Sequence, residues 1–225
     1  MLFDGRAVRE NLRNRDGKRV FYLGKGDSLT SEARDFLSGE RIEILPADKA
    51  RPEEYRLLSG GFAKEKPEHM THLHGDVLVP KTHPRILFRG AVDTLEAELL
   101  LAVRQAQGEM LGKLEEILAF TRKLIRWDVL EEPCQEGKLC GLTEHEIRER
   151  SHRPQEFYGK PHFMPTGHES GLLLQINRAR CAARQAELYG TAAFTDREGV
   201  PTRTDLIRCL NRLSSMLYLL MIEEV

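Results

Sequence analysis

The hydrophobic positions of the chain take up a helical period from Pro84 onward. Apolar side chains recur at intervals of three to four residues up to about Ile125, and Gly108 interrupts the pattern. Proline suits the first turn of a helix. We therefore expect either two helices or one kinked helix between Pro84 and Ile125. The apolar face expected for the first part is made of Leu87, Ala91, Leu95, Leu99 and Val103.

Two further helices are predicted, over residues 171–194 and 202–224. In the last of these, leucines are spaced by four and three residues, which is the seam of a helical bundle. These leucines are Leu206, Leu210, Leu213, Leu217 and Leu220. The intervening residues 131–170 contain four prolines and one short helical pattern over 142–150, which predicts a long structured connection. Residues 84–225 are therefore predicted to form a mainly α, bundle-like domain.

The first part of the chain has a different pattern. Residues 19–23 and 41–45 are short β-prone runs, and Thr30 is placed to cap a helix between them. We expect residues 1–60 to form a small α/β segment. Residues 61–83, which follow a stretch rich in Pro, Gly and charge, are predicted to be a linker and a loop.

Charge and composition exclude several classes of protein. Lys and Arg number 34 against 35 Asp and Glu, a formal net charge of −1, so overall charge does not favour a nucleic-acid partner. No apolar stretch approaches the ~20 residues that cross a bilayer, and the N-terminus shows no apolar signal core. The four cysteines form no CxxC pair. We expect a cytoplasmic protein that associates with neither nucleic acid nor membrane.

Charged side chains lie on one side of the helix that begins at Pro84. Arg85, Arg89, Asp93 and Glu96 are spaced by four, four and three residues, and Lys81 precedes them. One interpretation is a solvated face with an Arg89–Asp93 ion pair worth about 0.3–0.5 kcal/mol. The other interpretation is that these side chains form one half of a binding site for an anion.

The helix from residue 171 carries a comparable stripe, and the last helix interrupts its apolar surface with two polar residues. The stripe consists of Asn177, Arg180, Arg184 and Glu187. Asn211 and Ser215 are the two polar residues of the last helix. A basic surface face and a core amide that fixes helix register are the structural alternatives. Two stripes on neighbouring helices can also converge on one anion.

All eight histidines lie between His69 and His168. His69, His72 and His74 are close enough in sequence to suggest a metal cluster, but no carboxylate or cysteine completes a recognised ligand spacing. Histidines that face water are the alternative, and we assign no metal ligand.

Several segments together resemble the ATP:cobalamin adenosyltransferases, most closely their ethanolamine-utilization branch. The first is Lys81-THP-Arg85-ILFRGAV-Asp93, which resembles the pattern of the family's first helix. Three others follow in the family's order: MPTG at 164–167, Arg180-CAA-Arg184-QA-Glu187 and Asn211-Arg-Leu-Ser. THLHGDVLVPK, GLTEHEIRERSH and GDSLTSEARDFL extend the likeness to nearly the whole chain.

The resemblance implies a four- or five-helix bundle that transfers the 5′-deoxyadenosyl group of ATP to cob(I)alamin and releases triphosphate. Catalytic roles would fall to Arg180, Arg184 and Asp93, with Asp93 orienting Arg180. The residues implied to bind ATP are Lys81, Arg85, Thr71, Glu187 and Asn211. Asn211 would also contact the corrinoid, as would Phe163 or His162 on its lower face.

The resemblance also implies partners: Mg²⁺ with ATP, a homotrimer with sites between subunits, and a B12-dependent enzyme such as ethanolamine ammonia-lyase. The protein would lie in the cytoplasm or within a bacterial microcompartment. A cysteine-rich metal cluster and a Gly/Lys/Thr-rich phosphate loop found in some relatives have no counterpart here, the loop being reduced to Thr71-HLHGD. The alternatives are a non-catalytic microcompartment scaffold or corrinoid carrier, and a metal hydrolase built on the histidines.

Overall fold

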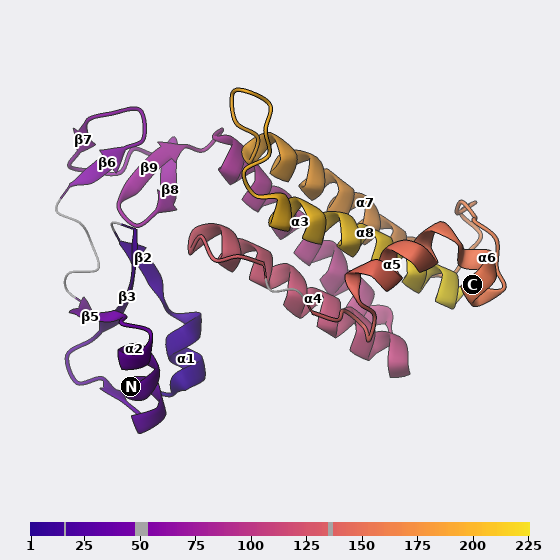
Figure 1. Ribbon diagram of the computed structural model, residues 1–225, viewed down its shortest axis with the longest axis horizontal. Coiled ribbons are helices and arrows are strands. Elements are labelled where there is room, and N and C mark those ends of the chain that lie inside the picture. The colour runs from indigo at the N-terminus through magenta and orange to yellow at the C-terminus, as the bar shows by residue number, and fades with distance from the viewer. Residues whose placement is uncertain (16, 48–53, 135–136) are drawn as a thin grey trace. The chain divides into compact units, whose positions relative to one another are not determined.

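The computed structural model describes residues 1–15, 17–47, 54–134 and 137–225. The chain divides into two compact units, Met1–His83 and Pro84–Val225 (Figure 1). The first unit is mixed and the second is helical, so the change of hydrophobic period at Pro84 coincides with the boundary between them.

The described part of the first unit contains short strands and two helices. In chain order these are β1 (Leu2–Phe3), α1 (Gly5–Glu10), β2 (Arg13–Arg15), β3 (Lys18–Leu23), β4 (Ser28–Leu29), α2 (Ser31–Gly39), β5 (Glu43–Pro46), β6 (Tyr55–Leu57), β7 (Phe62–Ala63), β8 (Met70–His74) and β9 (Val77–Pro80). Strands β3 and β5 pair in parallel with α2 between them in sequence, as the strand–helix–strand pattern predicted. Thr30 caps α2, its hydroxyl accepting from the Ala33 N–H at 3.2 Å.

Residues 61–83 contain strands where the sequence predicted a linker and a loop. A second sheet has the order β7-β6-β9-β8, and the β8–β9 hairpin buries Leu73, Leu78 and Val79. The hairpin turns at Gly75, where φ is +50° and an added Cβ would lie 2.6 Å from the Asn14 carbonyl oxygen. The apolar runs are too short, and the flanking charge too dense, for their pattern to show from sequence.

In its described residues, 84–134 and 137–225, the second unit contains four long helices and two short ones. They are α3 (Pro84–Gln105), α4 (Gly108–Val129), α5 (Glu144–His152), α6 (Pro154–Tyr158), α7 (Gly171–Ala193) and α8 (Thr204–Glu224). The expected break at Gly108 separates two helices, and this glycine has φ of +54°. The short helix expected at 142–150 is α5.

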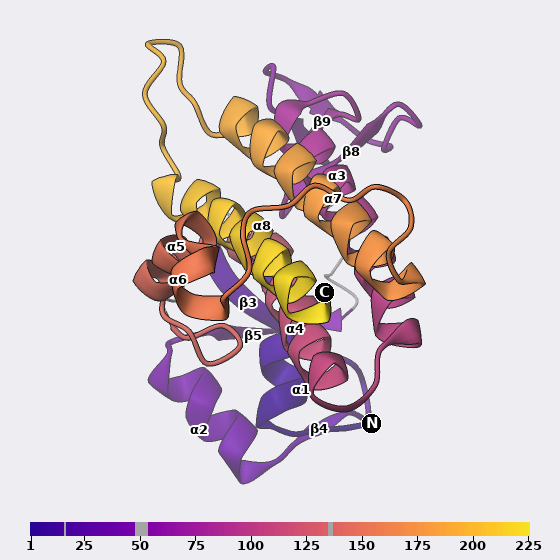
Figure 2. The ribbon, with the colours of Figure 1, turned by 90° about the vertical axis from the view of Figure 1, so that its right-hand side faces the viewer.

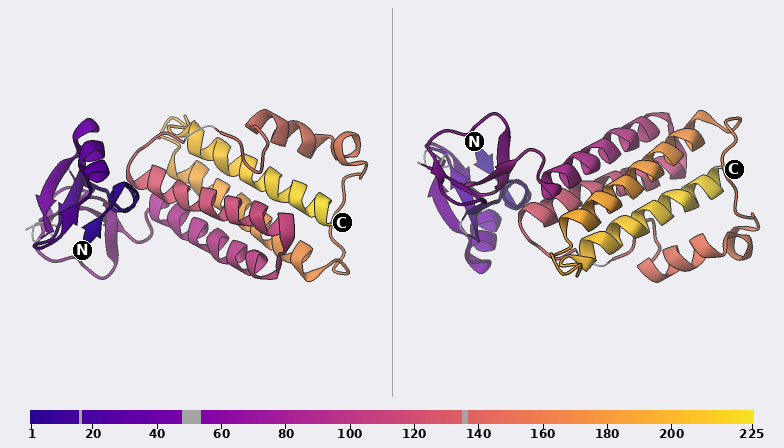
Figure 3. Two further views of the ribbon diagram at one scale, coloured as in Figure 1. Left: turned by 90° about the horizontal axis from the view of Figure 1, so that it is seen from below. Right: turned by 90° about the horizontal axis from the view of Figure 1, so that it is seen from above.

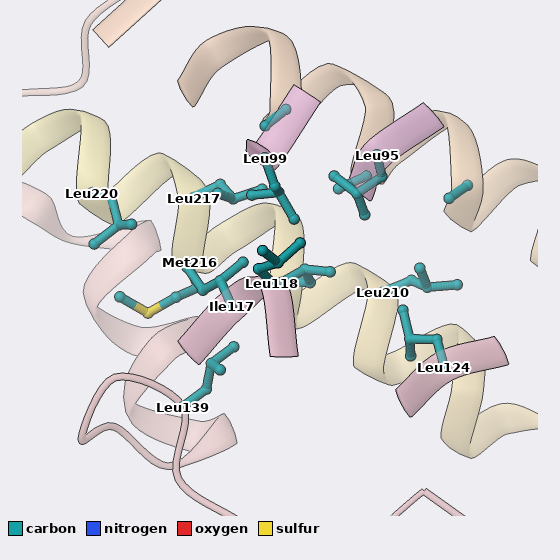
Figure 4. Close-up of a cluster of buried hydrophobic side chains, with 14 of the residues drawn as sticks. Leu95, Leu99, Ile117, Leu118, Leu124, Leu139, Leu210, Met216, Leu217 and Leu220 are labelled. Carbon is teal, nitrogen blue, oxygen red and sulfur yellow. The ribbon is translucent and has the colours of Figure 1, made fainter. Parts of the chain in front are cut away.

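The long helices lie side by side and enclose one apolar core (Figures 3 and 4). Helix α3 packs against α4 and α7, and α8 packs against α7 and α4. All five leucines of the predicted seam in α8 are fully buried. Leu87 is the error on the predicted face of α3: it is 43% exposed, and Phe88 is buried in its place.

The charged stripe at the start of α3 does not form the Arg89–Asp93 pair. Arg85 and Arg89 both turn to Asp128, near the end of α4. A carboxylate contributed by the neighbouring helix attracts both guanidinium groups, which sequence spacing along α3 alone could not show. Among the described residues, no helix has the length and apolar character that crossing a membrane demands.

Candidate active site

A cavity of 540 Å³ opens among α5, the segment before α7, and the polar faces of α7 and α8. Figure 2 shows α5 and α6 beside α8, with the segment that leads into α7 passing next to them. The cavity is lined by Ser151, His152, His162, Arg180, Arg184, Glu187, Leu188, Thr191, Asn211, Ser214, Ser215 and Tyr218. Arg180, Arg184, Glu187 and Asn211, which sequence spacing singled out on two helices, are therefore brought together.

Helix α7 supplies two guanidinium groups to this cavity. Both Nε and Nη2 of Arg180 donate to the Asn177 side-chain oxygen, at 3.1 and 3.0 Å, which fixes that side chain along the helix. Arg184, one turn further on, is exposed and has no hydrogen-bond or ion-pair partner within the described part of the chain. An unpaired guanidinium beside a fixed one suits an anionic ligand.

Helix α8 supplies an amide that is held from two sides. The Asn211 amide nitrogen donates to Glu187 Oε1 at 2.8 Å, and its oxygen accepts from Arg212 Nη1 at 2.9 Å. The amide thus joins α7 to α8 at the cavity wall. The sequence left open whether Asn211 fixes helix register or contacts a ligand. Its position fits both roles, because it links two helices and also lines the cavity.

Tyr218 also lines the cavity and was missed from sequence. It follows Asn211 by seven residues and Ser215 by three, so the three share one face of α8. The signal was therefore present as polar positions at helical spacing in an otherwise apolar helix. From sequence alone, however, a tyrosine in such a helix is equally typical of the apolar core.

The segment before α7 places His162 and Phe163 differently. His162 is exposed and lines the cavity, whereas Phe163 is half-buried and packs against the core. The turn after Phe163 is closed by Glu169, whose carboxylate accepts from the N–H groups of Thr166 and Gly167, each at 2.9 Å. Hydrogen bonds led by the one from Thr166 lower the pKa of Glu169 to about 2.

Two predicted site residues of α3 lie outside this cavity. Arg85 donates from Nε to Asp128 Oδ1 and from Nη2 to the Asp128 carbonyl oxygen, both at 2.8 Å. Asp93 is exposed and forms no hydrogen bond or ion pair with any residue that the structure describes. The single chain does not bring Asp93 to Arg180.

Thr71 and Lys81 belong to the first unit, on β8 and directly after β9. His72 and His74 lie on β8, and the His72 ring contacts Tyr55 and places Nδ1 3.1 Å from the Gly75 carbonyl oxygen. Within the described ranges, no three His, Cys, Asp or Glu side chains are arranged to hold a metal ion. The histidine cluster expected under the hydrolase alternative is therefore not assembled in these ranges.

Comparison with known families gives a match over most of the chain. The model of a family described as cobalamin adenosyltransferase matches residues 62–224, a range that contains β7, β8 and β9 of the first unit and α3 to α8 of the helical unit. The chain belongs to the cobalamin adenosyltransferase family. The cavity residues of α7 and α8 fall inside the matched range.

Relatives within the cobalamin adenosyltransferase family are similar over much of the chain. It is 30% identical to the corrinoid adenosyltransferase EutT of Salmonella typhimurium over 97% of this chain and 90% of that protein. It is 29% identical to the corrinoid adenosyltransferase EutT of Escherichia coli over 72% of this chain and 60% of that protein. The ethanolamine-utilization branch, to which the sequence motifs pointed, is thus the branch of these relatives.

Proposed function

We propose that the protein transfers the 5′-deoxyadenosyl group of ATP to the cobalt of cob(I)alamin, giving adenosylcobalamin and triphosphate. The observation that carries the proposal is the convergence of Arg180, Arg184, Glu187 and Asn211 on one cavity. Family membership and the EutT relatives support the same reaction. The four packed long helices would then be a bundle of the adenosyltransferase type.

In this reaction the protein must position the two substrates and balance their charge, but it need not supply a nucleophile. The electron pair of Co(I) attacks C5′, a cobalt–carbon bond forms, and the C5′–oxygen bond breaks to release triphosphate. No proton must move for the bond exchange itself. The protein must therefore hold about four negative charges next to a large corrinoid, which is a task for preorganised cationic donors and a site that excludes water.

Arg180 and Arg184 are the proposed phosphate ligands from the helical unit. Arg180 is already oriented by Asn177, so it loses little freedom on binding, while the unpaired Arg184 guanidinium can take two phosphate oxygens. Mg²⁺ bound with ATP would neutralise further charge. Asn211 and Glu187 would hydrogen-bond the nucleoside, and Asn211 would also meet the corrinoid edge.

We propose that the site is completed by a second copy of the chain. Asp93 is exposed on α3 and unpaired within the described chain, and Arg180 has a second edge to offer a carboxylate. A homotrimer in which Asp93 of one copy orients Arg180 of the next fits both observations. Thr71 and Lys81 are proposed to contact the triphosphate. Arg85, whose guanidinium is held by Asp128, is assigned instead to the structure of the α3–α4 pair.

The test is anaerobic incubation of the protein with Mg-ATP and chemically reduced cob(I)alamin. We expect light-sensitive adenosylcobalamin and one equivalent of triphosphate, separated by chromatography. Arg180→Ala and Arg184→Ala should each reduce turnover by about a hundredfold, as expected when one preorganised charge donor is removed. Arg178→Ala is the matched control, because Arg178 lies on α7 but pairs with Glu98 and does not line the cavity.

Folded wild-type protein that forms no adenosylcobalamin would contradict the proposal. A scaffold or corrinoid carrier would also show no thermal stabilisation by Mg-ATP, whereas a binding site filled at 100 times Kd stabilises by about 2.7 kcal/mol. Full activity after removal of transition metals and addition of Mg²⁺ alone would support magnesium as the sufficient cation.

The product would serve a B12-dependent enzyme. We propose ethanolamine ammonia-lyase as that enzyme, in the cytoplasm or inside a bacterial microcompartment, because the sequence motifs resemble the ethanolamine-utilization branch. Co-purification of the protein with the lyase, or with microcompartment shell proteins, would test the partner and the location together.

A further inference from the structure

Tyr218 of α8 holds the short segment that leads towards Pro165. Its hydroxyl oxygen lies 3.0 Å from His162 Nδ1 and accepts from the Phe163 N–H at 3.3 Å. The Tyr218 ring stacks on both neighbours: its centroid is 5.8 Å from that of His162 at 16°, and 6.1 Å from that of Phe163 at 24°. One side chain thus fixes two successive residues through its ring and its hydroxyl.

The hydrogen-bond partners decide which nitrogen of His162 carries the proton. His162 Nε2 lies 3.2 Å from the His152 carbonyl oxygen, which can only accept, so Nε2 must donate. In the neutral ring Nδ1 is then bare and accepts the Tyr218 hydroxyl proton. The Tyr218 oxygen keeps its lone pairs for the Phe163 N–H. Both ring nitrogens of His162 are therefore occupied.

This arrangement lies where a free imidazole would interfere with the proposed reaction. His162 and Tyr218 line the same cavity as Arg180, Arg184 and Asn211. A bare imidazole nitrogen is a strong donor to first-row metal ions, cobalt included. Nitrogen bound to the lower face of Co(II) makes its reduction to the nucleophilic Co(I) harder, because the donor raises the energy of the orbital that accepts the electron.

We propose that Tyr218 is a positioning residue that keeps His162 Nδ1 from ligating the cobalt of the bound corrinoid. The inference rests on the proposed corrinoid site. With Nδ1 tied to the Tyr218 hydroxyl, His162 presents ring carbon to the cavity. The segment then excludes water from the cobalt without supplying a ligand in place of water.

Tyr218→Phe removes the hydroxyl and keeps the ring that stacks on His162 and Phe163. The variant is prepared with uniform ¹⁵N labelling and mixed with Mg-ATP and unlabelled cob(II)alamin for electron paramagnetic resonance. Nitrogen from the corrinoid's own base splits each cobalt line into three, whereas ¹⁵N from the protein splits it into two. We expect the two-line pattern in Tyr218→Phe, its absence in the wild type, and its loss when His162→Ala is added.

Tyr189→Phe is the matched control, since Tyr189 lies on α7 and does not line the cavity; it should behave as the wild type. Tyr218→Phe without protein-nitrogen splitting would overturn the inference, and so would a two-line pattern in the wild type. If the wild type makes adenosylcobalamin while either of these results is obtained, only the inference fails and the proposed function stands.

A second measurement needs no corrinoid. Nitrogen–proton correlation spectra of the labelled protein, assigned with His162→Ala, should show His162 protonated at Nε2 alone, with the Nδ1 signal shifted by the Tyr218 hydrogen bond. The shift should disappear in Tyr218→Phe. A wild-type ring protonated at Nδ1 would overturn the inference even if the enzyme is active. Failure of the wild type to bind corrinoid would overturn both proposals, but would leave the His162–Tyr218 hydrogen bond visible.

Discussion

Asp128 is a fully buried charge of the helical unit. Its side chain is 0% exposed, and its two carboxylate oxygens accept from Arg85 Nε at 2.8 Å and Arg89 Nε at 2.6 Å. Arg85 also donates to the Asp128 carbonyl oxygen. A carboxylate removed from water is stable only when it is paired and hydrogen-bonded, so these two arginines are needed for the packing of α3 on α4.

Asp128→Ala should therefore lower the free energy of unfolding by about 3–5 kcal/mol, because two poorly hydrated guanidinium groups lose their common partner. Urea denaturation followed by circular dichroism measures the change. Glu115→Ala, at an exposed position of the same helix, is the control and should alter stability by less than about 0.5 kcal/mol. An Asp128→Ala protein as stable as the control would show that the buried pair contributes nothing.

Helix α8 contributes Asn211, Ser215 and Tyr218 to the cavity. The first turn of this helix is held in place by Asp205. The carboxylate accepts from Arg203 Nε at 2.9 Å and from the Cys134 N–H at 2.9 Å, which ties the connection after α4 to the first turn of α8. Burial raises the pKa of Asp205, but the Arg203 and Cys134 hydrogen bonds outweigh it and lower the pKa below its ordinary value.

This lowered pKa predicts a pH dependence of stability. Because the folded-state pKa lies below the ordinary value of 3.8, the contribution of Asp205 is present above that pH and is lost as the pH falls through the folded-state pKa. Asp205→Asn should cost about 2 kcal/mol at neutral pH, typical of lost charge-assisted hydrogen bonds. The difference from wild type should shrink in acid.

Urea titrations of wild type and Asp205→Asn over a series of pH values measure this difference. Asp196→Asn, in the exposed turn before α8, controls for the loss of a carboxylate as such. A wild-type advantage that stays constant, or grows, as the pH falls below 3.8 would contradict the assigned pKa.

The proposed assembly can be tested at the scale of the whole molecule. If Asp93 of one copy orients Arg180 of another, then Asp93→Ala and Arg180→Ala chains are each defective, but a mixed oligomer regains intact pairs. Random assembly of equal amounts places an intact Asp93 next to an intact Arg180 at about a quarter of the interfaces. Co-expressed chains should therefore recover about a quarter of wild-type turnover.

Each variant assembled alone, and the two mixed after assembly without exchange, are the controls for this recovery. Co-expression that restores no activity would show that the two residues do not act across an interface. Arg178→Ala co-expressed with Asp93→Ala is a further control: every Arg180 is intact in this mixture, so about half of wild-type turnover is expected. Arg178 itself bonds Glu98 in its own chain.

At this largest scale the sequence by itself determined where the helical unit begins and the polarity of its helices, but not that residues 61–83 belong to the first unit. The change of period at Pro84 marks the boundary of the helical unit, and the seam leucines of α8 are all buried, because burial of apolar stripes follows directly from helical spacing. The stripe of α7 and Asn211 of α8 were likewise visible as polar positions on apolar helices.

Only the tertiary structure decided which polar groups meet. The family resemblance implies that Arg85 binds ATP, whereas in the structure its Nε donates to a carboxylate 43 residues away. Tyr218 and His162 lie 56 residues apart, and no spacing along one helix predicts their hydrogen bond. Periodicity reports which face of an element is apolar, whereas the partner of a charge or hydroxyl depends on how two elements pack, and that is fixed by the core.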